Sequence, residues 1–380
     1  METEKLYYAD PFLTEFDARV LSCEETKGGF AVVLDRTAFY PEGGGQPCDT
    51  GVLGGVRVSE VHEKAGAVTH TCVSPFPVGG TVRGTLDWAR RFDHMQQHSG
   101  EHICSGLICA RYGCDNVGFH MGADAVTIDF NADIPWDGLL EIEAAANRYI
   151  YEDHAIDIQL HRGAELDAID YRSKKPLEGD VRIVTFPDAD CCACCGTHVV
   201  RSGQVGIVKF LSVQKLREGV RIELLCGGRA YRYLSAAWEQ NHRIAQALSA
   251  RPTASAAAVE RLQEELSALR QRCAKLEESV FAGIAARHAG RGDVLLFEDD
   301  MSADSVRRLC DAVTEVCGGR CAVFAGADGA WKYAIGQRGG DLRALTKELN
   351  AALSGRGGGK PEFVQGSVGA ARAAIEDFFG

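Results

Sequence analysis

The sequence predicts an α+β protein made of four successive regions, because three changes of pattern occur along the chain. Short β-branched runs between glycine turns fill residues 1–88, and long helical patterns mixed with strands fill residues 89–240. A leucine heptad repeat lies in residues 241–290, and strands alternate with helices in residues 291–380. With 380 residues, 46% of them hydrophobic and 25% charged, the chain can bury more than one core.

The first region is expected to form a small β-barrel, with a β-sandwich as the alternative. Its β-branched and aromatic runs are separated by turns such as Lys27-Gly28-Gly29. The expected strands are residues 18–23, 30–34, 56–61 and 67–71.

The second region is expected to be an α+β domain. Helices are expected over residues 90–112 and 137–153, and strands over residues 181–186, 206–213 and 220–225. Five basic residues between positions 201 and 221 face a single acidic one, which fits an RNA-facing surface or an ordinary solvated surface equally well.

The third region carries an a/d heptad seam over about three heptads, which predicts a helical hairpin or a dimerising coiled coil. The seam residues are Val259, Leu262, Leu266, Leu269, Cys273, Leu276 and Val280. The fourth region is expected to be an α/β domain that ends in an amphipathic helix over residues 370–379. Six basic residues face three acidic ones between positions 338 and 372, a balance compatible with contact to nucleic acid.

The compartment expected from the sequence is the cytoplasm. The chain opens on an acidic, mixed segment unlike a signal peptide, and it contains no apolar run of the ~18 residues that a membrane span needs. Its 15 cysteines are therefore expected to be reduced thiols, some of them on metal. A net charge of -12 argues against a protein that coats nucleic acid without specificity.

The segment His98-Ser99-Gly100-Glu101-His102 predicts half of a metal site. Histidines at positions i and i+4 lie about one turn apart on one helix face, so both imidazoles can reach one ion. Chance also produces such pairs on ordinary helices. Glu101 is a candidate proton carrier beside them.

The segment Cys191-Cys192-Ala193-Cys194-Cys195-Gly196-Thr197-His198 predicts the other half. Cys194 and His198, together with the two helical histidines, form a mixed nitrogen and sulfur set that suits Zn²⁺ better than magnesium or calcium. Four protein ligands are typical of a structural zinc site, whereas a catalytic site keeps one position open. Both alternatives stand at this point.

A third motif is the glycine-rich loop that runs from Thr37 through Phe39-Tyr40-Pro41-Glu42-Gly43-Gly44-Gly45 to Gln46. Bare glycines indicate a turn between strands. The flanking polar side chains favour a second interpretation, in which Thr37, Gly43, Gly44 and Gln46 lie against a ligand.

Together these motifs resemble the editing domain of alanyl-tRNA synthetase, and they are still more similar to its free-standing relatives, the AlaX trans-editing proteins. The flanks agree, since Arg91-Phe92-Asp93-His94-Met95-Gln96-Gln97 precedes the histidine pair and Val220-Arg221-Ile222-Glu223 follows the cysteines. The run from Gly355 to Gly366 resembles the glycine-rich motif of the synthetase's C-terminal domain, so the likeness is to the long AlaX form.

The resemblance implies a zinc-dependent deacylase that acts in translation fidelity. His98, His102, Cys194 and His198 match the family's zinc ligands, and Thr37 and Gln46 match polar positions near its substrate pocket. The implied partner is tRNA(Ala) charged with serine or glycine, and the implied role of the C-terminal domain is tRNA binding and homodimerisation. The chain begins at the editing-type β domain, so we expect no aminoacylation domain.

Two departures and two rival functions accompany this resemblance. Glu101 stands where the family often has glutamine, Cys195 stands where synthetases have glycine, and Cys191 and Cys192 add thiols that could compete for metal. The pattern H-x-x-E-H also fits a zinc peptidase, although that alternative leaves the cysteines and glycine motifs unexplained. A tRNA-binding module with a structural zinc is the non-enzymatic alternative.

Overall fold

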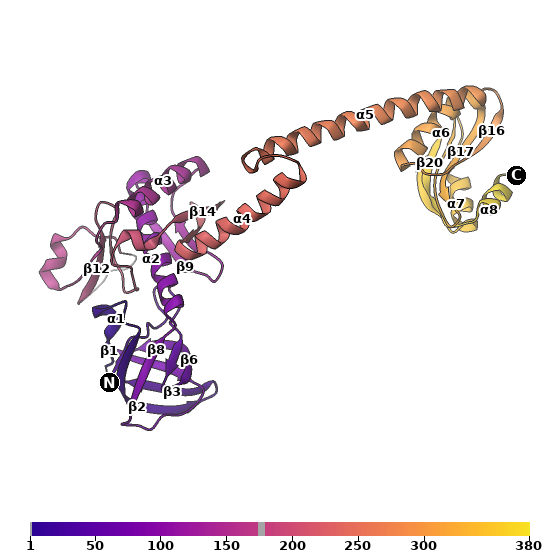
Figure 1. The fold of residues 1–380 in the computed structure, drawn as a ribbon. Helices are drawn as coiled ribbons and strands as arrows, with labels where there is room; N and C mark the ends of the chain where they lie inside the picture. Colours follow the sequence, from indigo (N-terminus) through magenta and orange to yellow (C-terminus); the bar gives the residue numbers. More distant parts are fainter. Residues whose placement is uncertain (1, 174–178) are drawn as a thin grey trace. The chain divides into compact units, whose positions relative to one another are not determined.

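The computed structural model describes residues 2–173 and 179–380, and the chain divides into two compact units (Figure 1). The first unit is Met1–Gln240 and the second is Asn241–Gly380. Both contain helices and strands, which confirms the α+β class. Among the described helices, none has the length and apolar character that a membrane span requires.

Six strands of the first unit close into a barrel in the order β2-β3-β7-β6-β5-β8 (Figure 1). They are β2 (Glu15–Thr26), β3 (Gly29–Leu34), β5 (Gly51–Leu53), β6 (Val56–Lys64), β7 (Ala67–Cys72) and β8 (Thr81–Leu86). Buried residues alternate with exposed ones in the first half of β2 and with half-buried ones along β7, so every second side chain there fills the barrel interior. The short α1 (Leu6–Ala9) follows β1 (Glu4–Lys5), which pairs with β4 (Arg36–Thr37).

The rest of the first unit is built around α2 (Trp88–Tyr112), whose central part is buried on nearly every side. It packs with α3 (Trp136–Glu152) against a four-stranded sheet of order β14-β15-β10-β9. These strands are β14 (Val208–Lys215), β15 (Val220–Cys226), β10 (Val126–Phe130) and β9 (Asn116–Met121). The expected helices over 90–112 and 137–153 are confirmed to within two residues, whereas β9 and β10 were not expected.

A smaller antiparallel sheet places the cysteine-rich segment. It consists of β11 (Asp157–His161), β12 (Val181–Phe186) and β13 (Asp190–Ala193). The 3-10 helix η1 (Gly163–Ala168) lies between β11 and β12 in the sequence, and the 3-10 helix η2 (Ser202–Val205) follows β13. The cysteine loop begins where β13 ends.

The second unit contains a five-stranded sheet of order β16-β17-β18-β20-β19, in which only the β16 and β17 pair is parallel. The strands are β16 (Gly292–Glu298), β17 (Gly318–Ala327), β18 (Ala330–Gln337), β19 (Arg356–Lys360) and β20 (Phe363–Val368). One core cluster joins the sheet to α6 (Ala303–Cys317), and another joins it to α7 (Arg343–Ala352) and α8 (Arg372–Phe379). The expected α/β region therefore has helices on both faces of its sheet.

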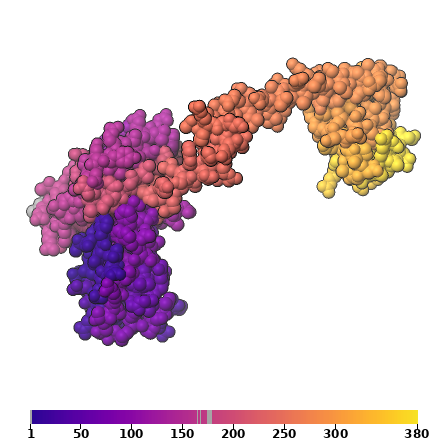
Figure 2. Space-filling view, in the orientation of Figure 1, coloured from indigo at the N-terminus to yellow at the C-terminus, as the bar shows by residue number. Residues whose placement is uncertain are grey.

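The heptad seam lies on one continuous helix, α5 (Ser255–Arg287), which follows α4 (Gly227–Ala247) and η3 (Pro252–Ala254). Two parts of α5 are covered: Ala258 near its start is buried, and Phe281 and Ala285 near its end pack into the core against α6. The leucines of the seam are exposed, with Leu269 at 58% and Leu276 at 60%. On the face that Figure 2 shows, no other described part of the second unit covers the middle of α5.

Candidate metal and substrate site

Two elements of the first unit bring the four expected metal ligands together. His98 and His102 project from α2, and Cys194 and His198 lie in the loop that follows β13. One donor atom from each residue lies within 4.8 Å of the donors of the other three, and the three imidazoles are almost fully buried. Residues 96 positions apart in the sequence therefore form one cluster that can hold a metal ion.

Each imidazole of this cluster is anchored from outside through its Nδ1 atom. The three contacts are His98 to Gln46 Oε1 at 2.8 Å, His102 to Asp190 Oδ2 at 2.8 Å and His198 to Ser99 Oγ at 3.3 Å. The Nε2 atoms of His98 and His198 lie 3.5 Å and 3.3 Å from Cys194 Sγ. Outer partners of this kind fix the ring orientation of metal-ligating histidines.

The electrostatics of the cluster favour a thiolate at its centre. Burial alone would raise the pKa of the Cys194 thiol, but His98 and His198 outweigh burial and hold this pKa well below its ordinary value. Burial lowers the pKa of His198 to about 3. Burial also opposes protonation of His102, yet hydrogen bonds with Asp190 and Cys194 raise its pKa well above the ordinary value. The Cys194 thiolate and the neutral His198 imidazole are the forms in which these side chains bind metal, whereas His102 would release its proton when a metal ion binds.

The neighbouring cysteines differ from Cys194 in accessibility and charge. Cys195 is exposed, and Cys191 Sγ lies 3.6 Å from Thr185 Oγ1. Cys192 lies close to His102 and Asp190, but burial raises the pKa of its thiol to about 11. Cys192 therefore remains a neutral thiol near pH 7 and is a poor competitor for the metal.

The glycine-rich loop makes a tight turn beside the cluster. Gly43 and Gln46 exchange both of their backbone hydrogen bonds, at 3.1 Å and 3.0 Å. Gly44 and Gly45 between them have φ values of +60° and +84°, which favour glycine. A Cβ on Gly45 would also lie 2.6 Å from the ring of Phe119. The turn thus requires its glycines for conformation and for close packing.

The two polar residues at the ends of this loop have different surroundings. Gln46 is fully buried behind His98, where its Nε2 donates to Thr197 Oγ1 at 2.9 Å and its Oε1 accepts the Thr197 amide at 3.2 Å. Thr37 is also fully buried, 2.8 Å from His70 Nε2, and its hydroxyl accepts the Phe39 amide. The polar atoms of both side chains therefore form hydrogen bonds within the protein.

A cavity of about 430 Å³ opens onto the cluster. The residues that line it are Gly44, His98, Glu101, His102, Asn116, Phe119, Arg172, Ser173, Asp180, Val181, Arg182, Cys192, Ala193, Cys194, Cys195 and Gly196. The structure thus places two ligand histidines, Gly44 and Glu101 in one wall. Thr37 and Gln46 are not among the lining residues.

Sequence reasoning missed the charged residues that hold this arrangement. Arg91 is fully buried at the start of α2, where it pairs with Asp49 of the glycine-loop segment and donates to the Pro11 carbonyl at 2.9 Å. Arg172 donates two hydrogen bonds of 2.7 Å to Asp190, the carboxylate that contacts His102 Nδ1. No local sequence pattern relates these charged residues to one another. Only Arg91 belongs to a recognised motif, the segment that precedes the histidine pair.

The surface between residues 201 and 221 is less basic than its sequence indicates. Three of its five cations pair with carboxylates, in the pairs Arg201–Asp153, Lys209–Glu143 and Arg221–Asp129. This favours the interpretation as an ordinary solvated surface.

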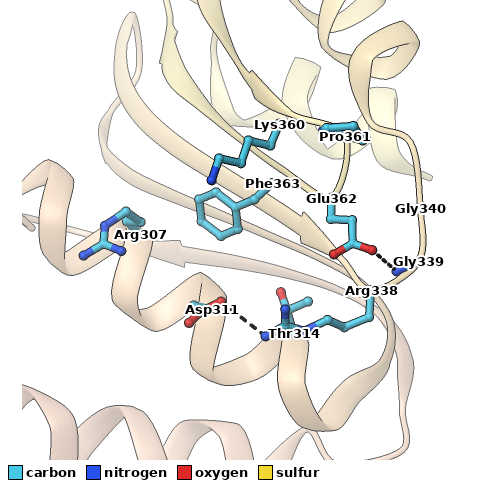
Figure 3. A pocket seen from close by; sticks show the side chains of 10 residues that line it. All are labelled: Arg307, Asp311, Thr314, Arg338, Gly339, Gly340, Lys360, Pro361, Glu362 and Phe363. Carbon is cyan, nitrogen blue, oxygen red and sulfur yellow. Dashed lines mark hydrogen bonds and ion pairs between the residues drawn. The ribbon is translucent and has the colours of Figure 1, made fainter.

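A second cavity, of about 540 Å³, lies in the second unit between α6, the turn that follows β18 and the turn that joins β19 to β20. Figure 3 shows Lys360 and Phe363 opposite the α6 residues Arg307 and Asp311. Arg338 pairs with Asp311 at 3.6 Å, and Glu362 accepts the Gly339 amide at 2.9 Å (Figure 3).

Half of the six cations counted between positions 338 and 372 form ion pairs. Arg338, Arg343 and Arg372 each pair with an acidic neighbour. Lys360 and Arg356, at the two ends of β19, have no ion pair among the described residues. Lys347 likewise has no ion pair there, so three of the six cations are unpaired in the described part of the chain.

Family models match two parts of the first unit. Residues 5–90 match the model described as tRNA synthetases class II (A), and residues 181–223 match the second additional domain of threonyl and alanyl tRNA synthetases. The barrel and the cysteine-bearing sheet are therefore domains of the kind found in these synthetases.

Whole-chain comparisons identify the family. The alanyl-tRNA editing protein AlaX-L of Pyrococcus horikoshii is 30% identical over 401 aligned positions, which cover 98% of this chain and 96% of that protein. The chain belongs to the AlaX-L family of alanyl-tRNA editing proteins. The recognition made from the motifs is confirmed.

Alanine–tRNA ligases are also similar, over part of their length. The ligase of Pyrococcus abyssi is 32% identical across 99% of this chain, and that of Halorubrum lacusprofundi is 33% identical across 96%. The chain spans 43% and 42% of these two ligases. The solved C-Ala domain of Aquifex aeolicus alanyl-tRNA synthetase aligns with 24% of this chain and 87% of its own, at 16% identity and a TM-score of 0.21, which is too low to carry an argument.

Proposed function

We propose that the chain hydrolyses the ester that joins serine or glycine to tRNA(Ala), with Zn²⁺ held by His98, His102, Cys194 and His198. Membership of the AlaX-L family makes it an alanyl-tRNA editing enzyme, a deacylase, rather than a peptidase. The observation that carries the proposal is the cluster of four donor atoms, three of whose residues, His98, His102 and Cys194, line a cavity. As an enzyme of translation fidelity, it would meet charged tRNA in the cytoplasm.

Zinc fits this donor set for two reasons. Three imidazole nitrogens and one thiolate form a mixed set of borderline softness, and each imidazole has the outer partner that zinc-ligating histidines usually have. Bound zinc would supply a Lewis acid that polarises the ester carbonyl or a water molecule.

The chain's own residues would hold the site in place. Gln46 and Asp190 keep His98 and His102 oriented, so we assign Gln46 a positioning role beside the proposed substrate contacts. Arg182 donates to the carbonyls of Cys194 and Gly196 at 2.7 Å and 3.0 Å, which fixes the cysteine loop. Gly43 shapes the turn that presents Gly44 to the cavity, where a backbone amide could donate to a developing oxyanion.

Selection of serine requires a group that hydrogen-bonds the serine hydroxyl. A pocket sized for alanine cannot strongly reject glycine or serine, so a second site must remove them. Thr37 remains our candidate for reading the hydroxyl. To do so it must exchange its contact with His70 for one with the substrate, because its hydroxyl donates to His70 Nε2. An alanyl ester would then leave a polar group without a partner.

Two further contacts are proposed for the second unit. Lys360 and Arg356 would contact tRNA phosphates. The exposed heptad leucines of α5 would pack against α5 of a second copy, because an apolar a/d seam is the pattern of a coiled-coil dimer. Light scattering of the chain and of a Leu266→Glu variant tests the dimer, which that charge should dissociate into monomers.

The structural-zinc alternative rests on the number of ligands, since four protein ligands are typical of a structural site. The test is release of amino acid from Ser-tRNA(Ala), Gly-tRNA(Ala) and Ala-tRNA(Ala) by metal-loaded protein. Fast loss of serine or glycine with slow loss of alanine supports the editing function. Binding of all three esters without hydrolysis would favour a tRNA-binding module.

A further inference from the structure

The cavity beside the metal cluster contains one buried carboxylate that the proposed hydrolysis leaves without a role. Glu101 lies on α2 between the two ligand histidines, at three residues from His98 and one from His102, and it is 4% exposed. Its side chain lines the same cavity as both imidazoles.

Neutral groups hold this carboxylate in a fixed orientation. Ser105 Oγ donates to Glu101 Oε1 at 2.7 Å, and Asn116 Nδ2 donates to the same oxygen at 2.8 Å. Asn116 Nδ2 also lies 2.8 Å from Ser105 Oγ, which closes a three-membered network. Both donors use Oε1, and no hydrogen bond to Oε2 is present among the described residues.

The other charged groups in the cavity wall have partners. Arg172 is bound to Asp190, and Arg182 donates to two backbone carbonyls and lies over the Tyr8 ring at 5.0 Å. Asp180 forms an ion pair with Arg162 at 2.9 Å. Glu101 alone among these four has neither an ion pair nor a hydrogen bond to a charged or carbonyl group in the described part of the chain, although it acts electrostatically on Arg172 and His102. A cationic group of a ligand can therefore form with Glu101 the direct ion pair that the protein does not supply.

We propose that Glu101 binds the α-ammonium group of the aminoacyl ester, and that the site therefore accepts esters with a free amine and rejects those whose amine is acylated. This inference rests on the proposed deacylase function. The ammonium group lies one carbon from the ester carbonyl. A carboxylate one helical position from His102 can therefore hold the ammonium group while the carbonyl lies at the metal cluster. An N-acylated ester lacks the charge and adds bulk at this point.

The consequence is a restriction on substrate class. Aminoacyl-tRNA enters the site in its free-amine form, whereas formylated, acetylated or peptidyl esters of the same tRNA leave Glu101 unpaired. The enzyme would thus spare a tRNA that already carries a growing or blocked chain, whatever its terminal residue.

The test compares Ser-tRNA(Ala) with N-acetyl-Ser-tRNA(Ala), using the full-length zinc-loaded wild type, Glu101→Gln and Glu141→Gln. Glutamine keeps an Oε1 acceptor for Ser105 and Asn116, so the variant should fold and bind zinc, which metal content and thermal unfolding verify. Glu141 is an exposed glutamate on α3, outside the cavity, and serves as the matched control.

We expect the wild type to prefer the free-amine ester about 10- to 100-fold, the range of one charge-assisted hydrogen-bonded contact. Glu101→Gln should raise KM for Ser-tRNA(Ala) by a similar factor, with kcat little changed. Hydrolysis of N-acetyl-Ser-tRNA(Ala) should be unaffected by this substitution, so the variant should hydrolyse the two esters with nearly equal kcat/KM. Glu141→Gln should match the wild type on both esters.

Three results would count against parts of this account in distinguishable ways. An equal fall of kcat on both esters in Glu101→Gln would overturn ammonium binding and place Glu101 in the chemical step. Equal hydrolysis of both esters by the wild type would overturn it as well, while leaving the editing function intact. Hydrolysis of neither ester by the zinc-loaded wild type would overturn the proposed function and this inference together.

Discussion

Gly196→Ala tests how the cysteine loop holds the metal cluster. Gly196 lies between Cys194 and His198, and a Cβ on it would lie 2.1 Å from His98 Cε1 and 2.3 Å from His98 Nδ1. The same Cβ would lie 3.0 Å from Gln46 Oε1, the atom that anchors His98. These neighbours are buried ring and amide atoms, so the imidazole must move away from its partner.

The size of the effect follows from these contacts. Forcing one methyl group into a packed site costs about 1–3 kcal/mol, and the loss of a histidine's outer partner lowers metal affinity about 10- to 100-fold. We therefore expect the zinc Kd of Gly196→Ala to rise about 10- to 100-fold, with a parallel loss of deacylation at limiting zinc.

The assay is competition for zinc with a coloured chelator, followed by deacylation of Ser-tRNA(Ala) over a zinc titration. Gly28→Ala is the control, because a Cβ on Gly28 meets nothing within 4 Å. A folded Gly196→Ala protein that keeps wild-type zinc affinity would refute the reasoning, since His98 would then not depend on this packing to bind metal.

Three further predictions concern the barrel and the second unit. Burial lowers the pKa of His70 to about 4, from about 6.5 in the unfolded chain. Between these two pH values the unfolded chain binds more protons than the folded one, so the free energy of unfolding should fall by up to about 3 kcal/mol as the pH drops from about 6.5 to about 4. Urea denaturation at pH 7 and pH 4.5 measures the loss, which should be smaller in His70→Gln. Thr37→Val should lower the free energy of unfolding by about 1–3 kcal/mol, because it leaves His70 Nε2 without its donor. If Thr37 reads the serine hydroxyl, the variant should also show a lower ratio of kcat/KM for Ser-tRNA(Ala) to kcat/KM for Ala-tRNA(Ala). An unchanged preference would leave Thr37 with a structural role alone. Lys360→Ala should weaken tRNA binding and reduce by about 1 the slope of the logarithm of the binding constant against the logarithm of salt concentration. Arg372→Ala is the control and should have smaller effects, because it removes a cation already paired with Glu376. Equal effects of the two variants in a filter-binding titration would argue against phosphate contact by Lys360.

Local patterns predicted the elements that carry the chemistry. The i, i+4 spacing of His98 and His102 requires a helix if both are to reach one ion, and α2 meets that requirement. The cysteine segment predicted the other half of the site, whereas the choice of Cys194 among its four cysteines rested on the family resemblance; the structure brings Cys194 and His198 to the two histidines.

Contacts between distant residues could not be predicted in the same way. Asp190 is 88 positions from His102, and Arg91 is 42 positions from Asp49, so no periodicity relates them. Only the fold brings these charges together. The same limit applies to Gln46, because no sequence pattern predicts its contact with His98, 52 positions away.

The strand β19 could not be predicted from the sequence because three of its five residues are glycine. The run from Arg356 to Lys360 was seen as a motif and not as β19, because glycine has low β propensity. Close packing explains its glycines, since a Cβ on Gly357 would lie 2.1 Å from the Tyr333 hydroxyl and one on Gly359 would lie 2.3 Å from the Phe363 carbonyl oxygen. The absence of side chains is what lets β19 join the sheet.

The most direct test of the central claim is a zinc titration of metal-free protein, with release of serine from Ser-tRNA(Ala) as the readout. We expect no activity without metal and a linear rise that ends at one zinc per chain, abolished in Cys194→Ala. Full activity of the metal-free protein, or no activity at saturating zinc, would contradict a metal-dependent editing site built from His98, His102, Cys194 and His198.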